Sequence, residues 1–512
     1  MSAPFFNSNQ ANDDDVFVFN PLYRLCNRSN HVVAYGYQGI GTWHFDRISA
    51  IALALCNGKR TVAEIAQCMR SFSNIENDTT ALDSTKRRIK PFLLAKTLTK
   101  EELRGQSAPD NRPYPESVLV TKTVFESTFK TSHIPLIEYD ARAFLPKTES
   151  EITWNVKRPI HEEIPLSLNW HITSECTTDC KYCYLGRRHT KLLEREIFFE
   201  RLEEAVRIGV CNIDLAGGDI ICSPYLIDML SVLKHHKLMP IMLSSKSHVS
   251  KNLARLLADV KDSILEFQFS IDSDDEQIAF YLTGMSGFPN RIFDSIVNVL
   301  ETGIPVTSKI VITPYNILTV PRLYCKLKSM GVNRIRLALY SRSGFHHTDD
   351  LFNHRESCDW LAKEVEKLQK EFPEESIYVQ NGTPSLKPIP AEVRKSSWKD
   401  RTLCPAGRSS MMICSDGKVI PCEQMPETDE YFCGDLTKQS IMEVWNGDKL
   451  KEMTYGMSRE KFKGQPCYDC EEREECHNVM GYCIRDLAAH YGNIYQPPPN
   501  CWRHDLPFIR QT

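Results

Sequence analysis

Apolar positions between residues 165 and 341 recur in short runs, and amphipathic stretches separate one run from the next. The runs that we expect to form strands cover residues 166–175, 212–218, 240–245, 265–272, 305–314 and 333–341. Segments such as "SPYLIDMLSVLKHHK" and "NRIFDSIVNVL" lie between them and repeat their apolar residues at helical spacing. Six such units in a row predict an α/β fold with a parallel sheet, curled or doubly wound, whose ligands bind at the carboxyl ends of the strands.

The pattern differs on either side of this core, which we place at residues 163–395. Residues 16–105 begin with strand-like alternation and continue with helical spacing, where Thr61 is a plausible N-cap before "VAEIAQCM". Small strands followed by helices predict a winged-helix-like module. Residues 106–162 open with the proline-rich, polar stretch "SAPDNRPYPES", so we expect a linker there. Residues 396–512 have few long apolar runs and hold nine of the 19 cysteines, which predicts a segment that metal holds in shape.

Length and composition fit a globular protein of several domains. The 512 residues exceed what one hydrophobic core supports, and 42% of them are hydrophobic. A net charge of −4 does not indicate the basic surface that nucleic-acid binding requires. Neither a membrane-spanning apolar run nor a signal peptide is visible, so we expect a cytoplasmic protein without a membrane partner. Because a reducing cytoplasm does not keep disulfides, 19 clustered cysteines indicate zinc or iron–sulfur sites.

Three cysteines follow the first predicted strand of the core, at the spacing C-x3-C-x2-C: Cys176, Cys180 and Cys183. A structural zinc site wants four ligands, whereas a [4Fe–4S] cluster held by three thiolates keeps one iron open. Over about residues 165–385 the pattern resembles the radical S-adenosylmethionine (SAM) superfamily. The resemblance implies a partial (β/α)6 barrel in which the amino and carboxylate groups of SAM bind the open iron. It also implies that an electron from the cluster cleaves SAM to a 5′-deoxyadenosyl radical, which abstracts a hydrogen atom.

The same resemblance implies a set of SAM contacts. An aromatic residue would lie against the adenine, and the segment "AGGD" stands where the family carries Gly-Gly-Glu. Glycines would let the backbone approach the methionine part of SAM, and the acid would accept from its ammonium. The remaining contacts would come from the ends of the third and fourth strands. The implied residues are Tyr182, Gly217, Gly218, Asp219, Ser245, Ser270 and Asp272.

The cysteines after residue 396 resemble the SPASM domain of radical SAM peptide maturases. That resemblance implies two auxiliary [4Fe–4S] clusters, one held by Cys467, Cys470, Cys476 and Cys501 and the other by Cys404, Cys422 and Cys483. Six residues precede Cys483 where the family has three, and two structural zinc sites are the alternative. Neither Cys414 nor Cys433 matches a ligand position of the set that contains Cys404, so we predict an open iron there. Glu423, next to Cys422, resembles the acid that takes the substrate proton in related maturases and is our candidate general base.

The N-terminal module resembles the PqqD-like recognition element of ribosomal-peptide modification systems, chiefly through "LALCNGKRTVAEIA". Such a module binds a leader peptide as an added strand. The whole pattern predicts an enzyme that cross-links a ribosomally made precursor peptide, with flavodoxin or ferredoxin as electron donor. A thioether is the first expectation, and a carbon–carbon or aryl ether macrocycle is the second. The alternatives are a sulfatase-maturase-like enzyme, which has no need of residues 16–105, and a zinc-stabilised peptide-binding scaffold.

Overall fold

The structure of the protein is a computed structural model. It describes residues 11–37, 41–73, 78–93, 117–129, 136–152, 156–186, 190–236, 241–341, 348–373, 377–380, 391–399, 403–498 and 501–503, with single residues 134, 346 and 375. These residues form two compact units, one within residues 11–159 and the other from residue 160 onward. The two units are described separately below.

Two small antiparallel sheets and four α-helices build the first unit within the described residues. Its elements are β1 (Val16–Phe19), β2 (Tyr23–Asn27), β3 (Val32–Gly36), β4 (Gly41–Phe45), α1 (Arg47–Leu55), β5 (Asn57–Thr61), α2 (Val62–Ser73), α3 (Asp78–Ile89), β6 (Leu119–Thr121) and α4 (Lys122–Thr128). One sheet has the strand order β5-β1-β6 and the other the order β2-β3-β4. The apolar core of the unit includes Phe17 of β1 and Ile51 of α1, both wholly buried.

Thr61 caps α2, as the sequence predicts. The Glu64 amide donates to Thr61 Oγ1 at 3.2 Å, and the Thr61 amide donates to Glu64 Oε2 at 2.8 Å. This reciprocal pair is a capping box, which satisfies two amides that the helix itself leaves without partners.

The expected linker over residues 106–162 differs from the structure. Strand β6 (Leu119–Thr121) lies within it and pairs antiparallel with β1, with Phe17 opposite Thr121. Helix α4 (Lys122–Thr128) follows directly, and residues up to 159 belong to the first unit. The pattern near residue 119 is too short to read as a strand, and its partner lies about 100 residues earlier. The proline-rich stretch that motivated the expectation lies outside the described residues, apart from Ser117 at its end.

A parallel sheet forms the centre of the second unit. Its strands follow the order β13-β12-β11-β10-β9-β8-β7, so each new strand adds next to its predecessor. All six predicted strands are present, and β13 is a short seventh that the sequence analysis did not include. Their bounds are β7 (Ser167–His171), β8 (Asn212–Ala216), β9 (Ile241–Ser245), β10 (Ile264–Ser270), β11 (Val306–Ile312), β12 (Arg334–Leu339) and β13 (Val379–Gln380).

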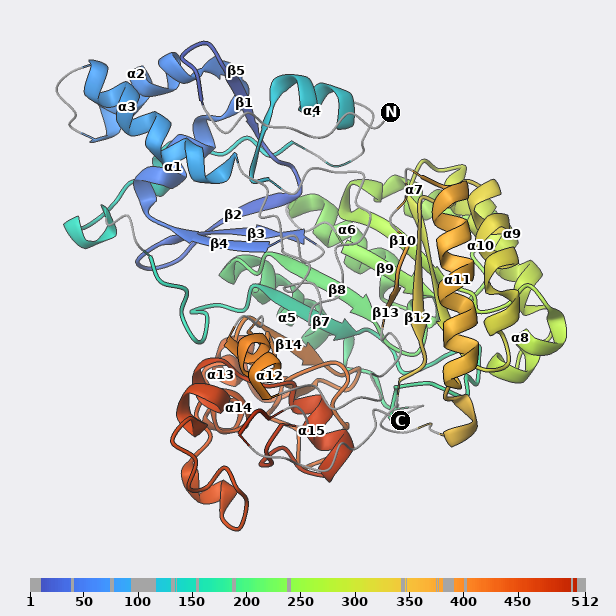
Figure 1. Ribbon diagram of the computed structural model, residues 1–512. Coiled ribbons are helices and arrows are strands. Elements are labelled where there is room, and N and C mark those ends of the chain that lie inside the picture. Colours follow the sequence, from blue (N-terminus) through green and yellow to red (C-terminus); the bar gives the residue numbers. More distant parts are fainter. Residues whose placement is uncertain are drawn as a thin grey trace. The chain divides into compact units, whose positions relative to one another are not determined.

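Helices connect successive strands and cover the outer face of the sheet, as Figure 1 shows for α7, α9, α10 and α11. Side chains alternate between the two faces of every strand, so those on the face that the helices do not cover are available to form a site. The connecting helices are α5 (Arg195–Ile208), α6 (Leu226–His236), α7 (Lys251–Asp259), α8 (Glu276–Thr283), α9 (Phe288–Leu300), α10 (Val320–Ser329) and α11 (Arg355–Glu371).

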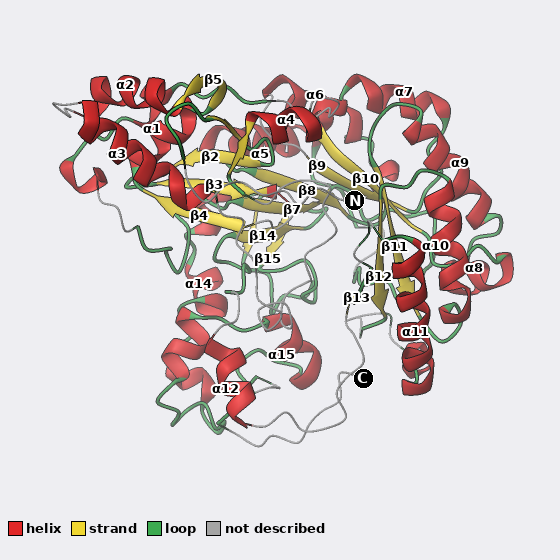
Figure 2. Cartoon of the chain, turned by 45° about the horizontal axis from the view of Figure 1, so that its top comes forward, coloured by secondary structure: helices red, strands yellow, loops and turns green. Residues whose placement is uncertain are grey.

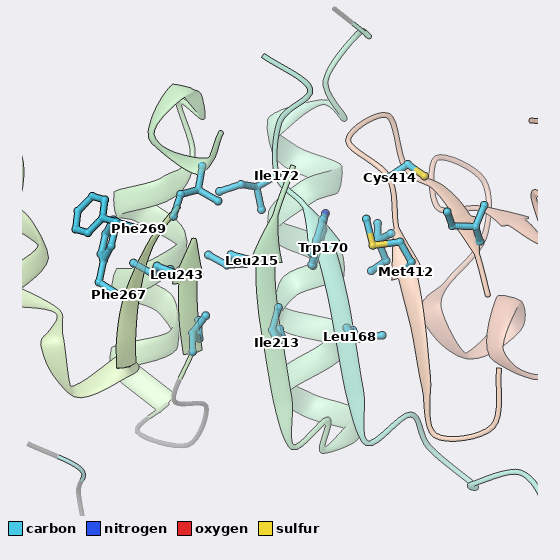
Figure 3. Packing of buried hydrophobic residues seen from close by; sticks show 14 of the residues in the cluster. Leu168, Trp170, Ile172, Ile213, Leu215, Leu243, Phe267, Phe269, Met412 and Cys414 are labelled. Carbon is cyan, nitrogen blue, oxygen red and sulfur yellow. The ribbon is translucent and has the colours of Figure 1, made fainter. Parts of the chain in front are cut away.

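The cysteine-rich segment extends this sheet. Strand β14 (Ser410–Ile413) pairs parallel with β7, and β15 (Lys418–Ile420) and β16 (Gly434–Asp435) continue the sheet beyond it (Figure 2). The barrel is therefore partial, because the outer edge of β7 pairs with β14 instead of β13. Figure 3 shows that Trp170 of β7 and Met412 of β14 belong to one cluster of buried apolar side chains. The expected boundary at residues 395/396 thus falls inside one compact unit, since β14 shares both sheet and core.

The remaining helices belong to the cysteine-rich segment: α12 (Ala391–Lys399), α13 (Ile441–Trp445), α14 (Asp448–Thr454) and α15 (Ile484–Tyr491). None of the helices in the described residues combines the length and the apolar character that a bilayer crossing requires.

Candidate active site

The three cysteines of the first motif lie on the loop that leaves the carboxyl end of β7. Thr178 Oγ1 is 3.2 Å from Cys176 Sγ and 3.4 Å from Cys180 Sγ, so a single hydroxyl lies beside two of the thiols. The loop is held by the end of α8, because the Asp179 amide donates to the Thr283 carbonyl at 2.7 Å. Three thiols on one short loop match the donor set of a [4Fe–4S] cluster with an open iron.

Gly217 and Gly218 let the end of β8 approach this loop. A Cβ atom on Gly217 would lie 2.3 Å from the Thr173 carbonyl oxygen, and one on Gly218 would lie 2.1 Å from the Glu175 carbonyl oxygen. Gly217 also has φ +142°, a conformation that side chains disfavour. The sequence analysis assigned both glycines to the approach of SAM. The structure gives them an additional reason, which is contact with the backbone of the cysteine loop.

The Asp219 carboxylate, which follows β8, accepts hydrogen bonds from the end of the neighbouring strand β9. Ser245 Oγ donates to its Oδ1 at 2.7 Å, and the Lys246 amide donates to its Oδ2 at 2.6 Å. The residue is 2% exposed, and burial raises the pKa of Asp219 while these hydrogen bonds oppose the rise. Asp219 and Ser245 are thus bonded to each other in the structure, and their contact with SAM stays a prediction.

Tyr182 and Asp272, two further predicted contacts, are bonded to each other and to Lys246, a residue that was not among the predicted contacts. The Tyr182 hydroxyl donates to Asp272 Oδ2, and Lys246 Nζ lies 2.6 Å from that hydroxyl and 3.2 Å from the same carboxylate oxygen. The Val311 amide donates to Asp272 Oδ1 at 2.7 Å. Burial lowers the pKa of Lys246, but Asp272, Cys180 and Tyr182 raise it well above its usual value. Ser270 ends β10 beside this group, opposite Lys309 of β11.

The inner face of the sheet carries charged side chains. Arg334 binds Glu266 with an N–O distance of 2.6 Å. Burial raises the pKa of Asp214, on β8, to about 6, with the charge of Glu423 among the smaller causes. Burial lowers the pKa of Lys309, and the charge of Glu423 opposes that shift. The Glu423 carboxylate therefore faces the same interior as Asp214 and Lys309.

Glu423, the candidate base, also contacts the catalytic loop. The Tyr184 hydroxyl donates to Glu423 Oε1 at 2.8 Å, which joins the residue after Cys183 to the residue after Cys422. The hydrogen bond places Glu423 next to the loop that carries Cys176, Cys180 and Cys183, and its role as a base stays a prediction.

His171 is a residue of this region that the sequence analysis missed. It ends β7, is 1% exposed, and has no hydrogen bond to either ring nitrogen among the described residues. Its Nδ1 atom lies 3.6 Å from Glu427 Oε1, and its ring centre lies 6.0 Å from that of Tyr184. A polar residue at the end of the first core strand, on the side that faces the barrel interior, is the sequence feature that could have identified His171.

Three thiols of the first auxiliary set converge. Burial raises the pKa of Cys404 and Cys422 to about 11 each, and the charge of Cys483 adds to the rise at Cys404, as that of Cys404 does at Cys422. Cys483 itself is exposed. The other two cysteines nearby take different positions. Cys414 is wholly buried in the apolar core (Figure 3), and the Cys433 thiol donates to the Val419 carbonyl at 3.3 Å.

Four thiols of the second auxiliary set also gather. Burial raises the pKa of Cys467 above its usual range, and the charges of Cys476, Cys501 and Cys470 add to the rise. The four thiols line a cavity of about 20 Å³ together with the indole of Trp398. The assignment of these cysteines to two auxiliary clusters stays a prediction.

Sequence profiles of known families match the two halves of the second unit. Residues 170–324 match the radical SAM superfamily, and residues 404–471 match SPASM, an iron–sulfur cluster-binding domain. The chain therefore contains a radical SAM domain followed by a SPASM domain. This confirms the expected fold class of the core and of the C-terminal segment, and it confirms SAM and [4Fe–4S] clusters as cofactors. The cysteine loop described above fits the SAM-binding cluster, which with SAM supplies a 5′-deoxyadenosyl radical.

Individual proteins resemble longer parts of the chain. PqqA peptide cyclase from Gluconobacter oxydans is 24% identical over 343 residues, which are 66% of this chain and 90% of that protein. PqqA peptide cyclase from Methylorubrum extorquens strain PA1 is 23% identical over 346 residues, which are 66% of this chain and 85% of that protein. Among solved structures, Streptococcus suis SuiB bound to its precursor peptide SuiA matches with a TM-score of 0.57 at 14% identity. That match covers 96% of this chain and 99% of SuiB, and it shows a shared fold.

Proposed function

We propose that this radical SAM protein modifies a ribosomally made precursor peptide by hydrogen abstraction and an oxidative cross-link. The observation that carries the proposal is the hydrogen bond between Tyr184 and Glu423, which joins the radical-forming loop to the first auxiliary set. An acid placed between the two can take a proton from the substrate while the auxiliary set takes its electron. The similarity to peptide cyclases and the fold shared with SuiB support a peptide as the substrate.

Glu423 is the proposed base. Its carboxylate accepts from Tyr184, which fixes one oxygen, and it faces the barrel interior where Asp214 and Lys309 lie. The ten cysteines hold the clusters in the sets given above, and Tyr182, Gly217, Gly218, Asp219, Ser245, Ser270 and Asp272 are the proposed surroundings of SAM.

The bond that we favour is a thioether. Only three thiols converge at Cys404, Cys422 and Cys483 within the described part of the chain, because Cys414 and Cys433 are engaged elsewhere. A cluster held by three thiols leaves an iron for a substrate thiolate, which metal binding deprotonates and positions. A carbon–carbon or aryl ether macrocycle is the second choice.

The first unit is the proposed recognition element for the leader peptide. Its sheet β2-β3-β4 has β2 and β4 as outer strands, and an extended peptide can add to such an edge by backbone hydrogen bonds. A sulfatase-maturase-like enzyme would not need this unit. We further propose that the enzyme works in the cytoplasm with flavodoxin or ferredoxin as its electron donor.

The test is anaerobic reconstitution of the full chain with iron and sulfide, followed by incubation with SAM, dithionite and a candidate precursor peptide. We expect 5′-deoxyadenosine to form together with a peptide that has lost two hydrogen atoms. Alkylation of the product then separates the linkages, because a thioether consumes a cysteine thiol whereas the other two do not. Formation of 5′-deoxyadenosine without any change in the peptide's mass contradicts the proposed substrate.

A further inference from the structure

Lys246 places a buried cation next to the loop that holds the catalytic cluster. It follows β9, its side chain is 16% exposed, and its backbone amide is fixed by Asp219 at 2.6 Å. The ammonium lies 4.6 Å from the centre of the Tyr182 ring and donates to the Tyr182 hydroxyl at 2.6 Å. Because Tyr182 stands between Cys180 and Cys183, these contacts place the charge of Lys246 against the cluster-binding loop.

The charges around Lys246 are of both signs. Asp272 lies 3.2 Å away and carries the opposite charge, and the more distant Lys309 faces the same interior. Among these three charges, the Lys246 ammonium is the one that contacts both the hydroxyl and the ring of Tyr182, within the cluster-binding loop.

We propose that Lys246 is a positioning residue for electron transfer, whose buried ammonium raises the reduction potential of the cluster bound by Cys176, Cys180 and Cys183. Reduction adds one electron from an external donor, which is dithionite in the test below, and no covalent bond changes. The added negative charge is stabilised by a nearby cation in a poorly solvated site. The inference concerns the radical SAM domain alone, so it holds whichever peptide is modified.

The experiment is a potentiometric titration of the reconstituted full chain, without SAM, followed by EPR. The catalytic signal is isolated by subtracting the spectrum of the catalytic triple variant, in which Cys176, Cys180 and Cys183 are alanine. For Lys246→Met we expect a more negative midpoint. At the wild-type midpoint, the ratio of reduced to oxidised catalytic cluster should fall about tenfold, which corresponds to a shift of about 59 mV for one electron.

Three further variants separate charge from structure. Lys246→Arg keeps the charge and should restore the midpoint most of the way to the wild-type value. Asp272→Asn removes the opposing charge and should shift the midpoint in the positive direction. Lys309→Met is the matched control, because this lysine also lies in the barrel, on β11 opposite Ser270, and Glu423 is the charge that acts on it most strongly. It should shift the catalytic midpoint much less than Lys246→Met.

The auxiliary clusters are an internal reference, because their midpoints should stay the same in every variant. An unchanged catalytic midpoint in Lys246→Met overturns the proposal, and so does an equal shift in Lys309→Met. If Lys246→Met fails to assemble the catalytic cluster, Asp272→Asn decides instead, and a negative shift or no shift in that variant overturns the proposal.

Discussion

Replacing Gly218 with alanine tests how closely β8 must approach the cysteine loop. The new Cβ atom would lie 2.1 Å from the Glu175 carbonyl oxygen and 2.6 Å from the Ser174 carbonyl oxygen. An ordinary contact begins near 3.4 Å, so the two segments must separate by about 1.3 Å. Both atoms that meet the methyl group are backbone atoms, which cannot rotate away as a side chain would.

The separation breaks identified hydrogen bonds. The Gly218 amide donates to the Thr173 carbonyl at 2.9 Å, and the Asp219 amide donates to the Glu175 carbonyl at 2.7 Å. Losing both bonds and forcing the backbone apart should cost roughly 2–4 kcal/mol of unfolding free energy. The same displacement moves the loop that carries Cys176, and a shift of about 1 Å between reacting groups lowers a rate about 100-fold.

The assay combines bound iron, the EPR spectrum of the catalytic cluster and the rate of 5′-deoxyadenosine formation. Gly218→Ala should lose one cluster's share of iron, or keep the cluster and lose most SAM cleavage, while the auxiliary signals persist. Gly209→Ala is the control, because Gly209 has φ +87° and nothing lies within 4 Å of its Cβ position. That variant should lose about 1–2 kcal/mol from backbone strain alone and keep its catalytic cluster. Wild-type cluster content and SAM cleavage in Gly218→Ala would refute the reasoning.

Other changes isolate single groups. The catalytic triple variant should form no 5′-deoxyadenosine and keep its auxiliary iron; continued SAM cleavage would remove those cysteines from the site. Glu423→Gln should lower the yield of modified peptide and leave SAM cleavage intact, and a normal yield would exclude Glu423 as the base. Burial raises the pKa of Asp214 to about 6, so its stabilising contribution is complete below pH 4 and is lost as the pH rises through 6. Asp214→Asn should therefore raise the melting temperature at pH 8 more than at pH 4, and equal shifts would contradict this sign. Cys414→Ala and Cys433→Ala should each keep the first auxiliary cluster, and its loss in either would mean that the iron is closed by that thiol.

Local patterns in the sequence predict much of the fold. The six core strands follow from short apolar runs, because a parallel strand under a helical layer is apolar over most of its length. Thr61 is predictable as a cap because the capping signal lies within four residues. The cysteine sets are predictable because the spacing of the cysteines along the sequence is set mainly by the cluster that they bind, and less by the fold around it.

Pairings between strands that lie far apart in the sequence cannot be predicted from such local patterns. Strand β14 pairs with β7 although about 240 residues separate them, and a run as short as "SMMI" does not indicate its partner. Strand β6 was read as linker for the same reason. The contacts of Lys246 also depend on three different strand ends, and a lysine at such an end reads as a solvated residue until the fold brings Tyr182 and Asp272 to it.

The pairing of β14 with β7 accounts for the position of Glu423. Met411 of β14 lies opposite Leu168 of β7, and the hairpin β14–β15 ends close to Cys422. The sheet thus fixes where the cysteine-rich segment begins relative to the strand whose end carries the catalytic loop. The proposed oxidative cross-link removes a proton and an electron from the substrate that the radical has attacked, so the proposed base and the first auxiliary set need a fixed position near the radical. A shared sheet provides that fixed position through backbone hydrogen bonds, whereas a flexible connection between separate domains would not.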